Sequence, residues 1–450
     1  MQNNRSTAKL IEGPIGKTLT KMTIAMTFGL MGMVAFNLVD TFFVGKLGTD
    51  QLAALSFTFP VVLVVSSIAL GLGFGASAVI SRAIGEGDHH KVQRLTTDSL
   101  LLSVIIVICF VIIGLFTIEP LFKALGATSK IIPYIKTYMR IWYFGMPFVV
   151  VPMVGNNAIR ATGDAKTPSI IMLIAVCVNT VLDPLLIFGI GPFPELGIKG
   201  AAIATVISRF TTFSVALWVL TKREKMISFD IPKISEILSS WKQVLFIGVP
   251  IAGARIIIPI TIGIITRIVS SYGIKAVAGF GVASRIEFFS LAVIHALASV
   301  FGPFIGQNLG AKKYDRVHTA ISISHRFTIL WEIAIFIILI LLRNHIAGIF
   351  NKDPQVISTI ALYLAIVPLS YTMQGIFVLS TTALNVMHKP LQAASLTIIQ
   401  MFLLCIPLAL LGSHLFGLTG IFAAIALSYV VSGIISRFVL LRYFKREMRQ

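Results

Sequence analysis

The chain has 450 residues, of which 56% are hydrophobic and only 12% are charged, and its mean hydropathy is +0.92. Soluble domains carry roughly 25% charged residues, so this composition excludes a water-exposed globular surface and indicates an integral membrane protein. The net charge of +19 does not indicate nucleic-acid binding, because the Lys and Arg residues lie in short loops between apolar segments.

Apolar segments follow one another along the whole chain, and each is long enough for the roughly 20 residues that cross a bilayer. We therefore predict an all-α membrane protein with about twelve transmembrane helices joined by short loops. The predicted helices lie at about 18–44, 51–82, 95–119, 129–157, 167–190, 198–221, 241–269, 276–304, 319–343, 354–384, 390–412 and 417–441.

The longest polar stretch lies near the middle of the chain and separates two halves. We predict an N-terminal six-helix bundle over 1–221, a cytoplasmic linker over 222–240 and a C-terminal six-helix bundle over 241–450. Roughly two dozen Lys and Arg fall in one set of alternate loops and under about ten in the other. This bias predicts a multi-pass protein of a bacterial or archaeal cytoplasmic membrane, with both termini in the cytoplasm.

The two halves resemble one another when the chain is aligned with itself at an offset of about 225 residues. The matched pairs are Gly48 with Gly273, Gly85 with Gly310, Tyr138 with Tyr363 and, after a short deletion, Gly197 with Gly417. Six helices are an even number, so the halves begin on the same side of the membrane and form a parallel repeat. Such a repeat is typical of transporters that work by alternating access. Because one chain supplies both halves of the cavity, we expect a monomer.

Asp40 and Asp183 lie inside predicted helices of the first half at positions where the second half is apolar. A carboxylate within the membrane is costly and marks a functional site by default. Asn179 and Asp183 are four residues apart on one helix face, and Asn37 and Asp40 are three apart on another. With Thr205, these groups would supply oxygen ligands for a hard cation or share a proton. The alternative is that they only hydrogen-bond helices together.

Other polar and aromatic residues within the helices have two interpretations each. Thioethers and aromatic faces suit an adaptable drug-binding surface, although each of them is also ordinary packing. The candidate substrate-binding residues are Met33, Phe36, Asn37, Met153 and Asn157, with Tyr371 and Met373 in the second half.

Three further features are interpreted structurally. Arg255 and Glu287 are expected to form a buried ion pair, and the alternative is that they face the substrate. Glu332 is expected near an interface or paired with Arg326, without a functional role. The glycine-rich run at 71–75 lies inside a predicted helix, so it indicates close helix packing rather than a nucleotide-binding loop.

Enzymatic and ATP-driven functions are not supported by the sequence. It contains no Walker lysine motif and no catalytic constellation within the predicted helices. The three cysteines lie in apolar runs and do not indicate a metal or disulfide site. We expect no cofactor and no metal other than a coupling sodium ion.

The segment Asn37-Leu-Val-Asp-Thr-Phe-Phe-Val-Gly, the loop from Asn156 to Pro168, and Asn179 with Asp183 resemble the multidrug and toxic compound extrusion (MATE) family. The resemblance covers nearly the whole chain. It implies an antiporter that is coupled to protons or sodium and expels organic, often cationic, drugs. It also implies that Asp40, Asn179, Asp183 and Thr205 form an N-terminal cation site.

The seventh predicted helix carries Arg255 and lacks the Glu that one branch of the family has there, and the tenth lacks an Asp. The chain therefore resembles the DNA-damage-inducible branch. The alternative transporter function is a lipid-linked oligosaccharide flippase, which would favour a more strongly cationic central cavity. A passive channel is disfavoured by the two-half repeat.

Overall fold

The computed structural model describes residues 8–230 and 232–448, and these residues are almost entirely helical. The chain forms two compact units. The N-terminal unit comprises residues 1–10 and 24–252, and the C-terminal unit comprises residues 11–23 and 253–450. Parts of the predicted elements lie outside the described residues. They are residues 1–7 and 449–450 of the two predicted halves and Ile231 of the predicted linker. The predicted linker over 222–240 stays a prediction, and the helix that follows it begins at Ile234.

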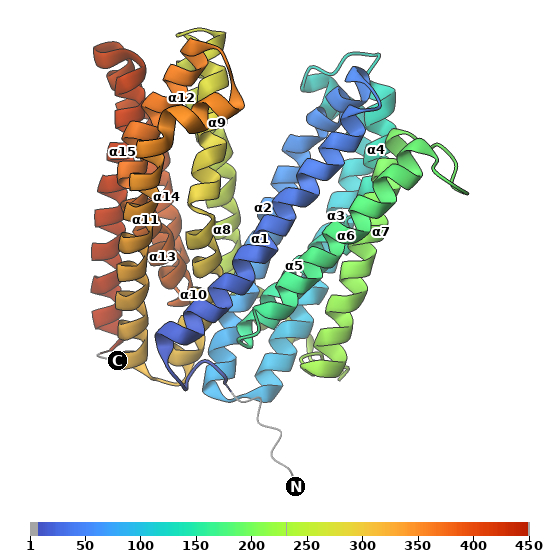
Figure 1. The fold of residues 1–450 in the computed structure, drawn as a ribbon. Coiled ribbons are helices and arrows are strands. Elements are labelled where there is room, and N and C mark those ends of the chain that lie inside the picture. Colours follow the sequence, from blue (N-terminus) through green and yellow to red (C-terminus); the bar gives the residue numbers. More distant parts are fainter. Residues whose placement is uncertain (1–7, 231, 449–450) are drawn as a thin grey trace. The chain divides into compact units, whose positions relative to one another are not determined.

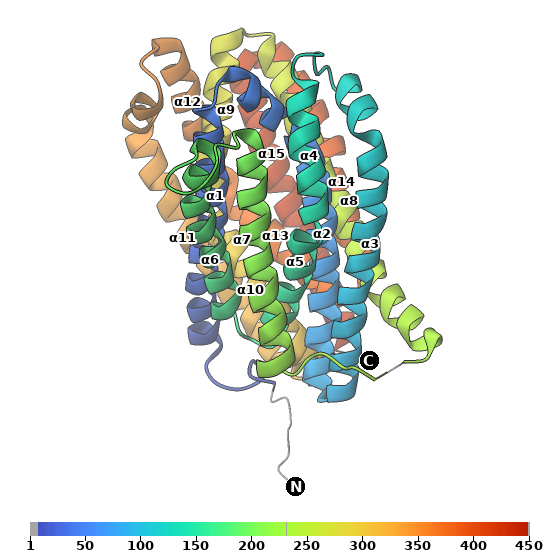
Figure 2. The same ribbon diagram turned by 90° about the vertical axis from the view of Figure 1, so that its right-hand side faces the viewer.

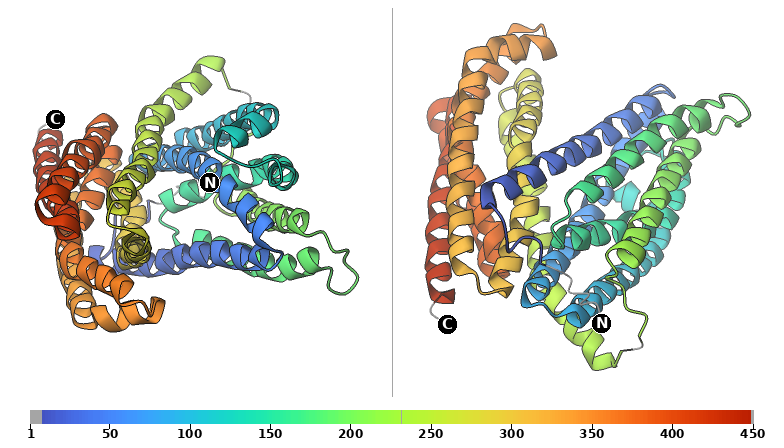
Figure 3. Two further views of the ribbon diagram at one scale, coloured as in Figure 1. Left: turned by 90° about the horizontal axis from the view of Figure 1, so that it is seen from above. Right: turned by 60° about the horizontal axis from the view of Figure 1, so that its bottom comes forward.

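The N-terminal unit contains six transmembrane segments, the first of which joins this unit at Ile24. Its helices are α1 (Ile15–Gly45), α2 (Thr49–Glu86), α3 (His89–Ala124), α4 (Ile132–Gly145), α5 (Pro147–Ala161), α6 (Lys166–Phe188) and α7 (Ile198–Trp218), followed by the π-helical turn η1 (Val219–Arg223). Helices α6 and α7 lie side by side, and α2 packs against α5 (Figures 1 and 2). Figure 3 shows α6 and α7, both green, next to one another in two further views.

The C-terminal unit begins within α8 (Ile234–Ser270) at Gly253. The remaining elements are α9 (Ile274–Ser290), α10 (Ala292–Gly310), α11 (Tyr314–Phe350), α12 (Pro354–Ile366), the 3₁₀ turn η2 (Val367–Ser370), α13 (Tyr371–Val386), α14 (Pro390–Ile398), the π-helical segment η3 (Ile399–Cys405) and α15 (Ile406–Glu447). Helix α13 packs along α15, and α11 packs against α12 and α13 (Figure 1).

Twelve membrane-spanning segments are present, as predicted, although several are bent. Ten helices of the described residues are individually long and apolar enough to cross a bilayer. Helices α4 and α5 form an eleventh span that is interrupted at Met146, and Gly417 divides the longest segment, 390–447, into two spans. Helices α9 and α10 together make one span with a break at Leu291. The fold is therefore an all-α membrane protein with two six-helix bundles.

The internal repeat is visible in the backbone. Positive φ angles recur at the predicted offset: Gly48 (132°) with Gly273 (100°), Gly87 (79°) with Lys312 (56°), and Gly163 (94°) with His388 (55°). Gly197 and Gly417 also match, with φ of 56° and 63° and ψ of −133° and −140°. Left-handed backbone is uncommon outside glycine, so its recurrence at equivalent loops indicates that both halves use the same turns.

The helices follow from their sequences. Long apolar runs satisfy all backbone groups within the helix, which a bilayer requires. Asp88 caps α3 by accepting from the Lys91 N–H at 2.9 Å, and Asp353 caps α12 through the Gln355 N–H at 2.9 Å. Large apolar side chains such as Phe116 (83% exposed) and Ile349 (81% exposed) face outward, where lipid would cover them.

Candidate functional site

The N-terminal unit brings together the four residues that the resemblance suggested as a cation site. Asp40 comes from α1, Asn179 and Asp183 from α6, and Thr205 from α7, which packs along α6. All four side chains are buried. The Asn179 Nδ2 donates to the Asp183 Oδ1 at 3.0 Å, as their spacing of one helical turn predicts. Asp40 of α1 and Asp183 of α6 interact electrostatically.

Several oxygen atoms of this cluster have no hydrogen-bond partner among the described residues. They are the Asp40 Oδ1, the Asn179 Oδ1, the Asp183 Oδ2 and the Thr205 Oγ1. Three of these atoms are amide or carboxylate oxygens that can only accept, and the Thr205 hydroxyl lies near Tyr138. Buried polar atoms are normally paired, so three unpaired acceptors in one cluster indicate a positively charged ligand. Carboxylate, amide and hydroxyl oxygens are the ligands that hard cations prefer, and two adjacent carboxylates also share protons. The arrangement therefore fits a proton or a small monovalent cation.

Two further residues, Arg209 and Tyr138, belong to the cluster and were not predicted from the sequence. Arg209 of α7 lies with its guanidinium 4.2 Å from the centroid of the Phe36 ring and interacts electrostatically with Asp40. Tyr138 of α4 is buried against the same group, where it interacts with Asp40, Asp183 and Thr205. Arg209 follows Thr205 by four residues and so shares its helix face, a signal that was present in the sequence.

The candidate substrate-binding residues of α1 occupy different environments. Phe36 is buried beneath Arg209, Met33 is half-buried and Asn37 is exposed. Asn37 and Asp40, three residues apart, lie on the same side of α1 but differ in burial, and the substrate-binding role of Asn37 stays a prediction. Asp40 is buried together with Phe36, which lies one full turn before it.

The candidate residues of α5 are engaged in local packing. The Asn157 Nδ2 donates to the Met153 carbonyl at 2.7 Å, and the Asn157 Oδ1 accepts from the buried Arg160 guanidinium. Both ends of the Asn157 amide are thus used within α5, which favours a structural role. Met153 is half-buried against the core of α2, α3 and α4.

The expected ion pair of Arg255 and Glu287 is not among the salt bridges of the described residues. The Glu287 carboxylate accepts hydrogen bonds from two tyrosines instead, Tyr363 of α12 and Tyr429 of α15, the latter at 2.8 Å. Two phenolic donors satisfy a carboxylate within the membrane without a second charge. Sequence reasoning did not anticipate them because both tyrosines are distant in the chain.

Asp164 stabilises the loop between α5 and α6, which is part of the segment from Asn156 to Pro168 that resembles the MATE family. Its carboxylate accepts from the Thr167 N–H at 3.0 Å and from the Thr167 hydroxyl, and it forms an ion pair with Arg223 at the end of η1. Burial raises the pKa of Asp164, but the hydrogen bonds from Thr167 and the charge of Arg223 outweigh burial and hold the pKa below its usual value. This loop joins α5 to α6 and fixes the start of the helix that carries Asn179 and Asp183.

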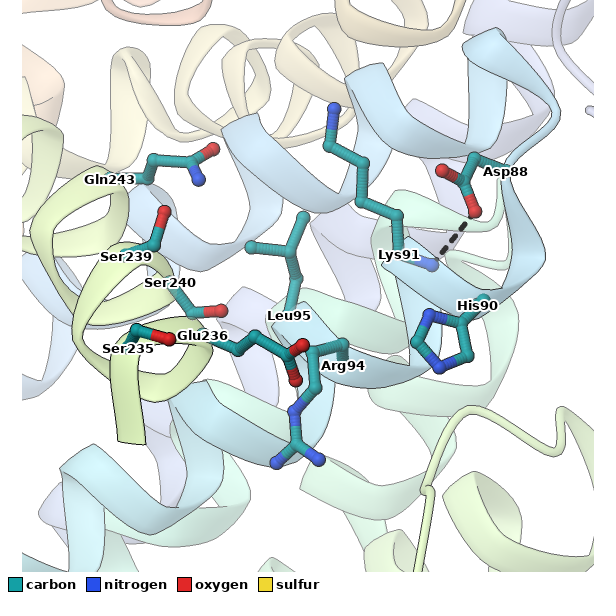
Figure 4. A pocket seen from close by; sticks show the side chains of 10 residues that line it. All are labelled: Asp88, His90, Lys91, Arg94, Leu95, Ser235, Glu236, Ser239, Ser240 and Gln243. Carbon is teal, nitrogen blue, oxygen red and sulfur yellow. Dashed lines mark hydrogen bonds between the residues drawn. The ribbon is translucent and has the colours of Figure 1, made fainter. Parts of the chain in front are cut away.

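A surface groove of about 360 Å³ lies where the start of α3 meets the start of α8 (Figure 4). Its charged groups are largely paired, because Arg94 forms an ion pair with Asp98 and the Lys91 ammonium lies 2.8 Å from Glu86. The dashed line in Figure 4 marks the bond of the Lys91 N–H to Asp88. The groove is lined by other residues than the Asp40 cluster, and its paired charges do not favour ligand binding.

A bundle of membrane-spanning helices in two repeated halves, with a buried oxygen cluster in one of them, defines a polytopic membrane transporter. The MatE family model matches residues 25–185 and 250–411. The chain therefore belongs to the MATE family of membrane transporters.

Individual relatives extend over nearly the whole chain. A Shewanella oneidensis protein named FAD transporter is 39% identical over 425 residues, which is 94% of either chain. The probable multidrug resistance protein YoeA of Bacillus subtilis is 27% identical, over 84% of this chain and 82% of its own. The crystal structure of the Vibrio cholerae MATE transporter VcmN in the bent form has 28% identity and a TM-score of 0.91, and the match covers 98% of this chain and 98% of that one.

Proposed function

We propose that this MATE-family transporter is an antiporter that exports organic compounds by alternating access, driven by the entry of protons or sodium ions. The observation that carries the proposal is the cluster of unpaired buried oxygens on Asp40, Asn179, Asp183 and Thr205. Binding of a cation there and binding of substrate exclude one another. Such reciprocal coupling lets the downhill movement of the cation drive the uphill export of the substrate.

The charges of the cluster set how many cations it binds. Asp40 and Asp183 supply two negative charges, and Arg209 supplies one fixed positive charge. A charged group within the membrane is costly unless it is neutralised, so the cluster requires one further positive charge. One proton or one sodium ion per cycle meets this requirement.

The substrate has two candidate classes. Export of organic, often cationic, drugs is supported by the relative named a probable multidrug resistance protein, and the cation-free cluster would carry a net negative charge that favours such molecules. Export of FAD is the second candidate, because the relative named FAD transporter is 39% identical over 94% of this chain. Arg209, beside an aromatic ring, offers a group for the phosphates of such a substrate.

The remaining expectations belong to the same proposal. The chain is placed in a bacterial or archaeal cytoplasmic membrane with both termini in the cytoplasm, following the distribution of Lys and Arg in its loops. It works as a monomer in contact with lipid, since each chain holds both bundles and a complete oxygen cluster. It requires no cofactor besides the coupling ion.

Proteoliposomes with separately imposed proton and sodium gradients test the proposal. Efflux of a fluorescent organic cation and of FAD is followed for the wild type, Asp40→Asn and the control Asp50→Asn, since Asp50 pairs with Lys130 in a loop contact outside the cluster. We expect one gradient to drive efflux of one substrate, with loss in Asp40→Asn and activity retained in Asp50→Asn. Gradient-independent flux of both substrates would overturn the proposal and favour the flippase alternative.

A further inference from the structure

Helix α11 of the C-terminal unit carries a row of buried polar residues on one face. The row consists of four buried residues, Ser324, His325, Thr328 and Glu332. Thr328 follows the adjacent Ser324 and His325 by four and three residues, and Glu332 follows Thr328 by four. Such a row is unexpected in a helix whose most apolar window has a mean hydropathy of 2.2. No function was predicted for these residues from the sequence.

Glu332 occupies the middle of α11, eighteen residues from either end of a helix that runs from Tyr314 to Phe350. Its exposed fraction is 0%, and neither carboxylate oxygen has a hydrogen-bond partner among the described residues. No ion pair with Arg326, or with any other described residue, is formed. An ionised carboxylate in such a place costs several kcal/mol, so Glu332 must hold a positively charged ligand.

The surroundings of Glu332 favour a proton as that ligand. A metal cation needs several oxygen or nitrogen donors, and no group of three His, Cys, Asp or Glu side chains that could hold one occurs in the described residues. The other buried polar groups on this face of α11 are two hydroxyls and one imidazole, without a second carboxylate. A proton needs only the carboxylate itself.

Tyr371 supplies the neighbouring group from α13. It is 0% exposed, its hydroxyl has no hydrogen-bond partner among the described residues, and it interacts electrostatically with both Glu332 and Glu287. It is the first residue of α13 and directly follows the 3₁₀ turn η2, where Pro368 interrupts the helix. Short 3₁₀ segments within longer helices often mark functional hinges, so Tyr371 stands where a small change of backbone would move its hydroxyl.

Two further titratable groups lie near this pair. Glu287 of α9, which interacts electrostatically with Tyr371, is hydrogen-bonded to Tyr363 and Tyr429. His325 lies seven residues, or two helical turns, before Glu332 on α11, and it interacts with Arg437 of α15. The buried His325 Nε2 also lacks a partner among the described residues.

We propose that Glu332 is a proton-binding site of the C-terminal unit, distinct from the Asp40 cluster, and that it releases and regains its proton during transport. Tyr371 donates a hydrogen bond to the ionised carboxylate and so makes the deprotonated state accessible. The proposal rests on the transport cycle proposed above, to which it adds a second titrating group, and it does not depend on which substrate is exported.

Infrared difference spectroscopy of the reconstituted protein at low and high pH tests this site directly, because a protonated carboxylic acid has its own carbonyl band. Glu332→Gln preserves the shape of the protonated side chain and removes the titration. We expect the variant to fold, to lose one carboxylic acid band, and to lose proton-driven flux at least tenfold while retaining substrate binding. Glu195→Gln, on an exposed loop, serves as the control with an unchanged spectrum.

Tyr371→Phe distinguishes a functional site from a merely buried acid. Without the phenolic donor the ionised form is less stable, so the pH midpoint of the Glu332 band should move to higher pH. An unchanged spectrum and full proton-driven flux in Glu332→Gln would overturn the proposal. If Asp40→Asn loses coupling while Glu332→Gln keeps the wild-type spectrum and flux, the Glu332 proposal is overturned and the N-terminal cation site is still supported.

Discussion

The Arg209 guanidinium lies 4.2 Å from the centroid of the Phe36 ring and interacts electrostatically with Asp40. A cation over an aromatic face is stabilised by about 1–2 kcal/mol when it is shielded from water. Phe36, which the sequence suggested as a substrate contact, therefore also positions a fixed positive charge. This charge reduces the negative charge of the two carboxylates and sets how many cations the cluster needs.

Replacement of Arg209 should change the coupling number. In Arg209→Gln both carboxylates require their own cation, so we expect the cluster to bind two cations per cycle in place of one, which raises the coupling number of the protein by one. We also expect a cation affinity at least about tenfold higher, equivalent to about 1.4 kcal/mol. The logarithm of the substrate accumulation ratio is plotted against the logarithm of the ion gradient at clamped membrane potential. The slope of this plot gives the coupling number. Arg209→Lys keeps the charge and should keep the wild-type slope. Active Arg209→Gln with an unchanged slope would refute the charge count.

Close packing of α2 against the first part of α8 depends on glycine. A Cβ at Gly75 would lie 2.6 Å from the Val244 carbonyl oxygen, and one at Gly71 would lie 2.5 Å from the Gly248 carbonyl oxygen. Gly75→Ala should destabilise the protein by about 2 kcal/mol, because backbone atoms must move apart. Gly253→Ala is the control, since a Cβ there meets nothing within 4 Å. Thermal unfolding in detergent measures both, and equal midpoints would argue against this contact.

The Asp164 loop should respond to acid. Because the pKa of Asp164 is lowered in the folded protein, its ion pair with Arg223 contributes stability above the unfolded-state value of about 3.9, and this contribution is lost as pH falls through the lower folded pKa. Asp164→Asn should lose about 1 kcal/mol or less at neutral pH, since Arg223 is partly exposed. The difference in unfolding midpoint between variant and wild type should shrink below about pH 4. A difference that stays constant with pH would exclude the ion pair as its cause.

The helices and the repeat were predictable because bilayer-spanning segments must be apolar over their whole length. Breaks such as Met146 and Leu291 were not, since they interrupt runs that stay apolar. Asp183 was predictable as a rare charge within a helix. The exposure of Asn37 was not predictable from its spacing: three residues turn a helix by about 300°, so Asn37 lies about 60° from Asp40 around α1 and is exposed, while Asp40 is buried.

Arg209 and Glu332 show where the sequence reasoning ended. The site residues predicted in the first half were oxygen ligands, and Arg209, a guanidinium one turn after Thr205, was not among them. Glu332 was expected near an interface or paired with Arg326, six residues before it, and no role was predicted for it. Its position at 0% exposure without a partner depends on contacts of α11 with α12 and α13, which no local pattern reveals.

The measurement that most directly tests the central claim compares two fluxes in Asp40→Asn proteoliposomes. Substrate counterflow, which needs binding and alternating access but no coupling ion, should persist at a rate close to that of the wild type. Gradient-driven accumulation should fall to the level of empty vesicles, because the cluster no longer exchanges its cation. Accumulation that follows the gradient as in the wild type would contradict the assignment of the coupling site to Asp40 and Asp183.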